Sequence, residues 1–214
     1  MSEERGFDFI VGGIEDGIID TLKAALLVTP QGGYLKSIEG YSGELDADQL
    51  RKALGDLTPR LPLMLVSYGE GEDTLDPATA PFQGMPRSYR HDCTFTVICV
   101  SGNARGEKAR RRGSTGVYKM IADVRRLLGG VKLKGRVAGT DEMVTLNPEP
   151  FRYGGVEYIA QLPELTAYAV HFDTYFRHGE PDRSQPGQPV RELVITIENT
   201  FEKGESNLPG VTIG

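Results

Sequence analysis

The sequence lacks long hydrophobic runs. No apolar stretch approaches the roughly 18 consecutive residues that a membrane-spanning helix needs. The opening residues, MSEERGFDF, place acidic side chains first and lack the long apolar segment of a signal peptide. Hydrophobic residues at 39% and charged residues at 25% are ordinary for a globular protein. We therefore expect a globular protein that stays in the cytoplasm and has no membrane partner.

Cysteines are also scarce. The two in the chain, Cys93 and Cys99, are expected on one strand. At about 3.3 Å per residue their Cα atoms would be roughly 20 Å apart, beyond the ~7 Å limit for a disulfide. Two thiols without a histidine cluster do not form a zinc site. We expect buried apolar cysteines, no disulfide and no metal site.

Motifs for catalysis or nucleotide binding are missing as well. Gly12 and Gly13 follow no strand, and no Lys-Ser/Thr pair comes after Gly17, so neither a P-loop nor a dinucleotide fingerprint is present. The adjacent residues 91–93 (HDC) would point to alternating faces of a strand and cannot align for proton transfer. We predict no catalytic residues and no cofactor.

One pair of side chains keeps an enzymatic alternative open. His171 and Asp173 share one face of an expected strand, and Tyr175 follows them on the same face. General acid–base chemistry would also need a pocket beside this pair. A deep pocket there would favour a small hydrolase or a ligand-binding module, and a flat polar surface would count against both.

The most regular pattern in the chain lies between residues 90 and 128. The segment His91–Val100 alternates, with the two cysteines, Phe95 and Val97 on one side, which predicts a strand. From Val117 to Leu128 apolar residues recur at helical spacing, and Ser114 is the expected N-cap. A strand and a helix that covers it form a two-layer α/β unit.

Weaker patterns predict the other elements. A polar lead over residues 1–13 is followed by a helix over 14–27. The run 61–68 is apolar enough for a strand that is buried on both faces. Glycine at 154 and 155 indicates a tight turn. The remaining predictions are strands over 34–41, 132–137, 156–162, 165–177 and 192–198, a short helix opening at Asp46, and connections over 69–89, 101–113 and 178–189.

These elements predict two regions. Residues 1–177 should form one domain with a surface loop inserted at 69–89, a length that is uncommon unless a loop binds something or is disordered. Residues 178–214 should form a linker and a C-terminal strand or arm. A strand on such a tether can pair within its own subunit or with the sheet edge of a neighbour.

The charge is divided along the chain. Its net charge is −6, but Arg105–Arg136 holds eleven Lys or Arg against two acids, which is +9 and leaves −15 for the remainder. The net negative charge of the whole chain argues against a protein that binds nucleic acid on its own. Opposite charges on separate faces suit subunits that meet head to tail.

The densest part of the basic segment is open to three interpretations. It can be a solvated loop, a contact for an acidic protein partner, or a contact for DNA phosphates. No aromatic residues alternate with it, which counts against single-strand binding. Together with the C-terminal strand it supplies our candidate interface residues: Arg105, Lys108, Arg110, Arg111, Arg112, Glu192, Val194 and Thr196.

Three segments carry a family resemblance. They are the central strand DCTFTVICVSGN, the helix GVYKMIADVRRLLGG and the closing GVEYIAQLPELTAYAVHFDTYFR, all within Leu61–Arg177. In these segments and in the order of its elements the chain resembles the tail-terminator and tail-completion proteins of contractile-tailed phages. The resemblance is most specific to the Mu-like prophage tail protein family encoded beside the sheath and tube proteins. The region after His178 departs from compact terminators.

The resemblance implies both a fold and a role. The fold would be α+β, with a mixed, largely antiparallel sheet and helices packed on it. The protein would form a ring of six copies that docks on the last ring of tail tube and sheath, ends their growth and joins head–tail connector proteins. It would be assembled in the bacterial cytoplasm, belong to the virion tail and need no catalysis, while DNA passes through its channel. A baseplate protein or a head–tail adaptor is the alternative.

Overall fold

The computed structural model describes residues 7–29, 32–41, 60–75, 88–102, 106–136, 143–161 and 165–179. It has an α+β fold. A five-stranded sheet in the order β1-β2-β3-β7-β6 is accompanied by the small two-stranded sheet β4-β5. The β1–β2 pair is parallel and the other described pairs are antiparallel. The predicted mixed, largely antiparallel sheet is therefore confirmed.

The described elements follow one another along the chain in an order close to the predicted one. Their bounds are α1 Phe7–Leu26, β1 Ser37–Gly40, β2 Leu63–Leu75, β3 Ser88–Gly102, α3 Glu107–Arg112, α4 Val117–Leu128, β4 Lys134–Arg136, β5 Met143–Thr145, β6 Arg152–Gln161 and β7 Leu165–Gly179.

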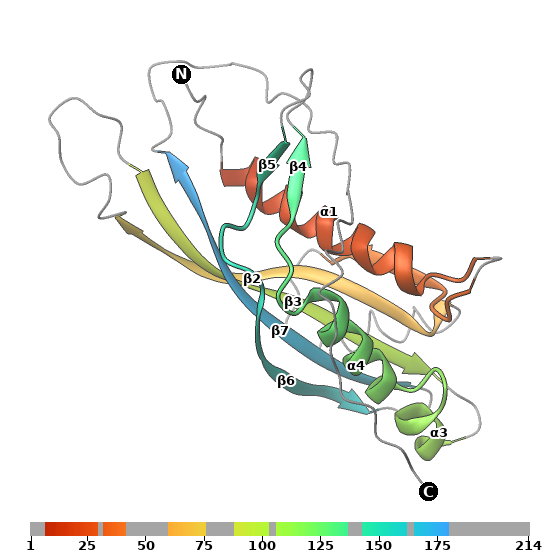
Figure 1. The fold of residues 1–214 in the computed structure, drawn as a ribbon. Helices are drawn as coiled ribbons and strands as arrows, with labels where there is room; N and C mark the ends of the chain where they lie inside the picture. Colours follow the sequence, from red (N-terminus) through yellow and green to blue (C-terminus); the bar gives the residue numbers. More distant parts are fainter. Residues whose placement is uncertain are drawn as a thin grey trace, which may run out of the picture.

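The two long helices cover one face of the sheet (Figure 1). Helix α1 packs against β1 and β2, whereas α4 packs against β3 and β7. Helix α3 lies at the end of the sheet where β3 finishes and β7 begins. The main core is the apolar layer between these helices and the sheet, to which α1 contributes Ile10, Ile14, Ile18, Leu22 and Leu26.

The alternation of the central strand β3 places its side chains as predicted. Phe95 and Val97 are fully buried on the helix-covered face, together with both cysteines, which are free thiols. Burial is the largest cause that raises the pKa of Cys93, to about 12, so this thiol stays protonated at neutral pH. On the opposite face Ile98 and Val100 belong to a second buried cluster.

Helix α4 also matches its predicted span. Val117, Met120 and Val124 are fully buried along one side. The predicted Ser114 cap is wrong, because Gly116 is the N-cap residue and no side chain caps this end. A Cβ at Gly116 would lie 2.8 Å from the carbonyl oxygen of Arg111, so the tight turn from α3 into α4 requires glycine here.

Helix α1 begins at Phe7, whereas the pattern predicted a polar lead and a start at Ile14. The two glycines near this start disfavour a helix locally, but Ile10 is buried and continues the apolar stripe one turn further. Tertiary packing therefore extends the helix. Glu15 and Asp16 consequently lie inside the helix instead of in its first turn.

The predicted surface loop 69–89 is too long. Residues 69–75 continue strand β2, and β3 already begins at Ser88. The segment Gly71–Leu75 pairs with Tyr89–Cys93 of β3, so its backbone groups are satisfied in the sheet although its side chains are polar. Cross-strand pairing, which local composition does not reveal, accounts for the difference.

Three other boundaries also differ. Gly154 and Gly155 lie inside β6, where a bulge replaces the predicted tight turn. The predicted connection 101–113 contains helix α3, and β7 continues to Gly179, past the predicted start of the linker at His178. The short helix from Asp46 and the strand over residues 192–198 lie outside the described residues, and the division at residue 177 stays a prediction.

Candidate functional site

Helix α3 carries the described part of the predicted basic cluster. Lys108 and Arg112 are exposed to solvent. Arg111 is more enclosed, and its guanidinium lies 3.1 Å from the carboxylate of Glu107 one turn earlier. The side chains of the other predicted interface residues lie outside the part of the chain that the structure describes: Arg105, Arg110, Glu192, Val194 and Thr196.

Exposed tyrosines lie beside α3. The rings of Tyr118 on α4 and Tyr158 on β6 both meet the ring of Tyr168, with centroids 6.1 Å and 5.5 Å apart. Tyr158 is 53% exposed and Tyr118 is 41% exposed, so much of this aromatic surface contacts solvent. Burial raises the pKa of Tyr168, whereas the nearby positive charge of Arg111 acts to lower it, so the basic helix lies next to the tyrosines.

The aromatic surface continues along β6. Val156 and Tyr153 are also exposed, and the guanidinium of Arg125 lies 4.1 Å from the centre of the Tyr153 ring. Tyrosine and arginine are the residue types that most often dominate binding energy at protein interfaces. We refer to Tyr118, Tyr153, Val156 and Tyr158 as the aromatic stripe.

Strand β6 is also the open edge of the sheet. It is the last strand in the order β1-β2-β3-β7-β6, and among the described strands only β7 pairs with it. Its ten residues make it much longer than β1, the four-residue strand at the other edge. An edge of this length presents a row of backbone donors and acceptors to which another strand can add.

The face of the sheet away from the helices is polar in the region predicted to hold an acid–base pair. His171 Nδ1 lies 3.1 Å from the Thr96 hydroxyl, and the Thr94 hydroxyl donates to Asp173 at 2.9 Å. Among the described contacts His171 and Asp173 are not hydrogen-bonded to each other. Each contacts a threonine on β3 instead, and His171 Nε2 also lies 3.5 Å from the carboxylate of Glu157 on β6. The arrangement is therefore a cross-strand polar ladder.

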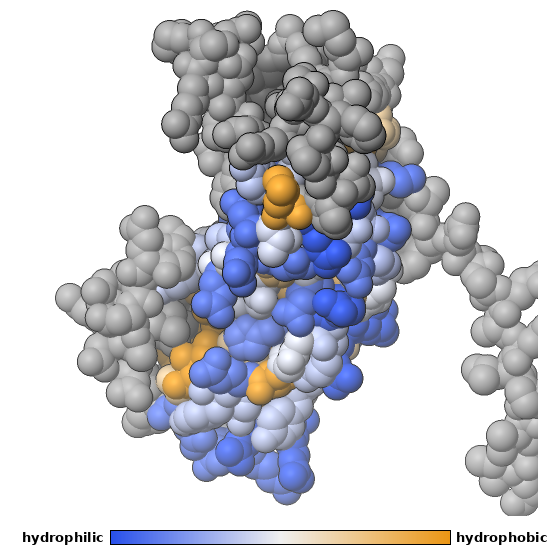
Figure 2. All heavy atoms as spheres, turned by 90° about the vertical axis from the view of Figure 1, so that its left-hand side faces the viewer, coloured by the Kyte–Doolittle hydropathy of each residue, from blue (hydrophilic) through white to orange (hydrophobic). Residues whose placement is uncertain are grey.

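An open depression of about 670 Å³ lies next to this ladder. Its lining includes four carboxylates and one arginine: Glu70, Glu72, Asp92, Asp173 and Arg152. Figure 2 views the molecule from the end where β2 and β7 finish, and the described surface there is mostly hydrophilic with small, separate hydrophobic areas. The depression is thus acidic, and it is not the deep pocket that a hydrolase would need.

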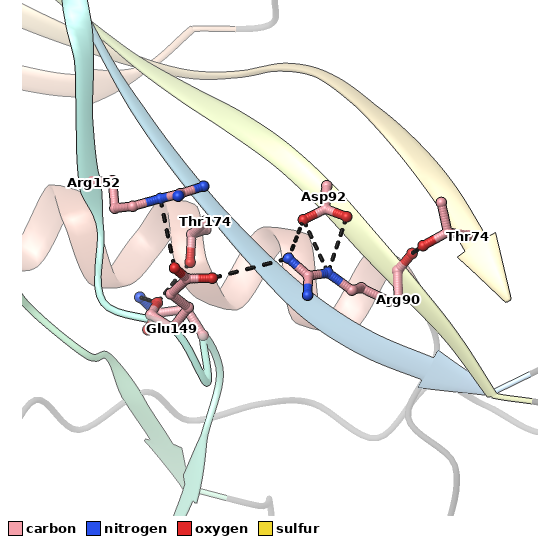
Figure 3. Close-up of polar contacts among 7 residues, drawn as sticks. Thr74, Arg90, Asp92, Glu149, Arg152 and Thr174 are labelled. Carbon is pink, nitrogen blue, oxygen red and sulfur yellow. Dashed lines mark hydrogen bonds and ion pairs between the residues drawn. The ribbon is translucent and has the colours of Figure 1, made fainter. Parts of the chain in front are cut away.

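An ion-pair chain runs between strands near the depression (Figure 3). Arg90 pairs with Asp92 at 2.6 Å, and Glu149 lies 3.9 Å from Arg90 and 3.6 Å from Arg152. The Thr174 hydroxyl donates to the backbone oxygen of Glu149 at 2.8 Å. These contacts hold the segment before β6 against β3 and β7, although each exposed ion pair alone contributes little stability.

A second polar cluster lies on the helix-covered face, at the same end of the sheet. His91 Nδ1 is 2.6 Å from Asp73 Oδ1, and His178 Nε2 is 2.9 Å from the same oxygen. The Tyr68 hydroxyl lies 2.7 Å from His91 Nε2. Burial would raise the pKa of Asp73, but the hydrogen bonds from His178 and His91 outweigh it and lower this pKa below its usual value.

A bulge in β2 makes this cluster possible. The register shifts between Tyr68 and Gly71, and this shift brings Asp73 to the face that Tyr68 occupies, although the two are an odd number of residues apart. A Cβ at Gly71 would lie 2.2 Å from His91 Nε2, so only glycine fits beside the ring. The sequence does not predict this cluster, because its composition favours a loop at Asp73 and no local pattern indicates the bulge.

Comparisons with known proteins identify a family. A family model described as "Bacteriophage Mu, Gp37" matches residues 10–177, which is well over half of the chain. No curated protein matches the chain. Within the described residues no helix is both long and apolar enough to cross a membrane.

Proposed function

The chain belongs to the bacteriophage Mu Gp37 family and is a Mu-like phage tail-related protein, and from this premise we propose that it is a tail terminator. It forms a ring that caps the tail tube and sheath, ends their polymerisation and offers a surface to the head. The family itself favours a structural role over an enzymatic one. The ring order that the resemblance implies is six.

The open β6 edge, with the aromatic stripe beside basic helix α3, is the observation that carries this proposal. Tyrosine and arginine gathered on one exposed edge are typical of a binding surface. No other described strand pairs with this edge, so its backbone groups can extend the sheet into a neighbouring chain. These features support assembly through surfaces.

The charges of the described residues support a head-to-tail arrangement. The acidic depression includes Asp92, near the start of β3, whereas α3 lies where β3 ends at Gly102. Ten strand residues correspond to roughly 33 Å, so the acidic and basic regions lie at opposite ends of one strand. When two different surfaces of the same protein meet head to tail, the copies form a ring if the rotation from one subunit to the next closes.

The partners follow from the same role. The ring would contact the tail tube and sheath on one side and head–tail connector proteins on the other. Residues 192–198 would add a strand to the β6 edge of the adjacent subunit. The basic residues of α3 would meet the acidic region of that subunit, with the phosphates of DNA in the channel as the other possible contact. The protein would then be part of the virion tail.

A baseplate protein or a head–tail adaptor is the second candidate, because the same surfaces would serve either one. The position of this protein in an electron micrograph of the tail would distinguish these two roles from that of a tail terminator. The enzymatic alternative has less support. Among the described contacts His171 and Asp173 are not paired with each other: each contacts a threonine, and His171 also lies 3.5 Å from the exposed Glu157. The nearby depression is open and mainly acidic.

Measuring the mass of the purified protein in solution tests the proposal directly. We expect light scattering to give about six times the mass of one chain, either alone or after mixing with tail tube subunits. Tube polymers capped by the protein should stop growing in the micrographs. The proposal would be contradicted if the protein stayed monomeric both alone and with tube subunits, and if tubes grew to the same length with or without it.

We expect Tyr158→Ala to weaken ring formation while the monomer stays folded. Tyr158 is half exposed on the edge strand, and truncation of an aromatic residue that dominates an interface costs about 2 kcal/mol or more, which is roughly 30-fold in affinity. Sedimentation over a concentration series measures the change. Leu75→Ala is the matched control, since it removes a similarly exposed apolar side chain from the end of β2. Equal association of both variants and the parent protein would exclude the stripe from the interface.

A further inference from the structure

The cluster at the end of β2, β3 and β7 has the composition of a metal site, although the sequence predicted none. The ligand atoms that Asp73, His91 and His178 can offer all lie within 4.8 Å of one another. We propose that these three residues bind a divalent transition-metal ion, with Zn²⁺ as the best match. This site lies at the same end of the sheet as the acidic depression but on the opposite, helix-covered face, and its metal binding can be measured without ring assembly.

The donor set favours zinc among common divalent ions. Two imidazole nitrogens and one carboxylate are the ligands found in open zinc sites, whereas Mg²⁺ and Ca²⁺ prefer oxygen ligands. Asp73, His91 and His178 come from three different strands, β2, β3 and β7. An ion bound between them would join the three strands at the end of the sheet.

Surrounding contacts orient the two imidazole rings. The ring of His91 lies 4.9 Å from that of Phe176, and the ring of His178 stacks on Tyr89 at 5.7 Å. With His91 Nδ1 as the metal ligand, its Nε2–H would donate to the Tyr68 hydroxyl, which lies 2.7 Å away. An outer hydrogen bond of this kind fixes the ring and its tautomer in metal sites.

Little movement is needed to admit the ion. The two nitrogens now lie at hydrogen-bonding distances of 2.6 Å and 2.9 Å from Asp73 Oδ1. With zinc–ligand bonds of about 2.0–2.2 Å, tetrahedral ligands lie roughly 3.4 Å apart. The Asp73 side chain is 47% exposed, so its oxygen can move out toward solvent by the required shift of less than about 1 Å. The three ligand atoms now lie within 4.8 Å of one another, so the two nitrogens must approach each other by at most about 1.4 Å, and water can take the fourth position.

The chain provides matched controls for a binding experiment. It has three histidines, and the third, His171, lies on the opposite face of the sheet next to Asp173. Replacing His178 or Asp73 should remove a ligand, whereas the same replacement at His171 or Asp173 should leave the site intact. His91 is buried, so a failure of its variants could reflect misfolding, and the test does not use it.

The experiment is equilibrium dialysis of the full chain, stripped of metal, against Zn²⁺, with bound zinc measured by mass spectrometry and the unfolding temperature measured in parallel. We expect one zinc per chain and a higher unfolding temperature with zinc. His178→Gln and Asp73→Asn should abolish both effects, while His171→Gln and Asp173→Asn should keep them. Tyr68→Phe should weaken zinc binding about 10–100-fold by removing the outer hydrogen bond.

Two outcomes would overturn the proposal. The absence of bound zinc in the parent protein would show that the cluster is held by its hydrogen bonds alone. Equal zinc binding by the parent, His178→Gln and Asp73→Asn would place the ion elsewhere on the surface. Neither outcome depends on ring assembly, so this experiment tests the metal site independently of the proposed function.

Discussion

Reversing two charges on α3, with Lys108→Glu and Arg112→Glu, should abolish ring formation while the monomer stays folded. Both side chains are exposed on the helix, so the free chain loses no buried contact. In the proposed ring they face the acidic region of the adjacent subunit, and like charges placed against each other across an interface cost several kcal/mol. Light scattering should show monomers, and tails made with the variant should lose their uniform length.

The matched control for this variant is Lys132→Glu with Lys134→Glu. It makes the same change in net charge at two exposed positions on and beside β4. Rings that form in the control and not in the α3 variant would locate the effect at α3. Rings of normal mass in the α3 variant would contradict the proposed charge-based interface. Loss of rings in both variants would show that the change in net charge alone prevents assembly. Rings of the parent should also weaken at high salt.

Phe95→Ala should cause the largest loss of folding stability among single substitutions in the core. Phe95 is fully buried on the central strand, and its ring packs edge to face against the rings of Tyr68 and Phe151. Truncating a buried phenylalanine to alanine removes its apolar contacts and leaves a cavity, at a cost of about 3–5 kcal/mol. Urea unfolding followed by circular dichroism measures the free energy of unfolding.

A milder core change on the same strand calibrates this result. Ile98 is buried on the opposite face of β3, in the second apolar cluster, and Ile98→Val removes one methylene group. We expect this variant to lose about 0.5–1.5 kcal/mol. If Phe95→Ala cost no more than Ile98→Val, the layer between the helices and the sheet could not be the main core.

The parts of the fold that were predicted correctly are those with a strong local period. The alternation around Phe95 and the helical spacing from Val117 to Leu128 each depend on neighbours within one element. The start of α1, the continuation of β2 past Tyr68 and the bulge at Gly155 were predicted wrongly. Each depends on a partner far away in sequence, which supplies the backbone pairing or the buried contact.

The same distinction between local and long-range signals applies to the candidate surfaces. A run of lysine and arginine is visible in the sequence, so the basic cluster was found, and part of it is indeed exposed on α3. The aromatic stripe was missed because Tyr158 is significant only once β6 is known to be the sheet edge. The metal-binding cluster was missed because residues 73, 91 and 178 meet only through the register of three strands.

By itself the sequence determined the central strand and its covering helix, the burial of both cysteines and the uneven charge, since periodicity and composition act over short distances. Only the tertiary structure decided which strand is the open edge, how far β2 extends and where the two histidines meet Asp73. The physical reason is that strand pairing satisfies backbone hydrogen bonds between distant segments. A bulge of one residue then determines which side chains share a face of the sheet, and no local sequence pattern indicates where that bulge lies.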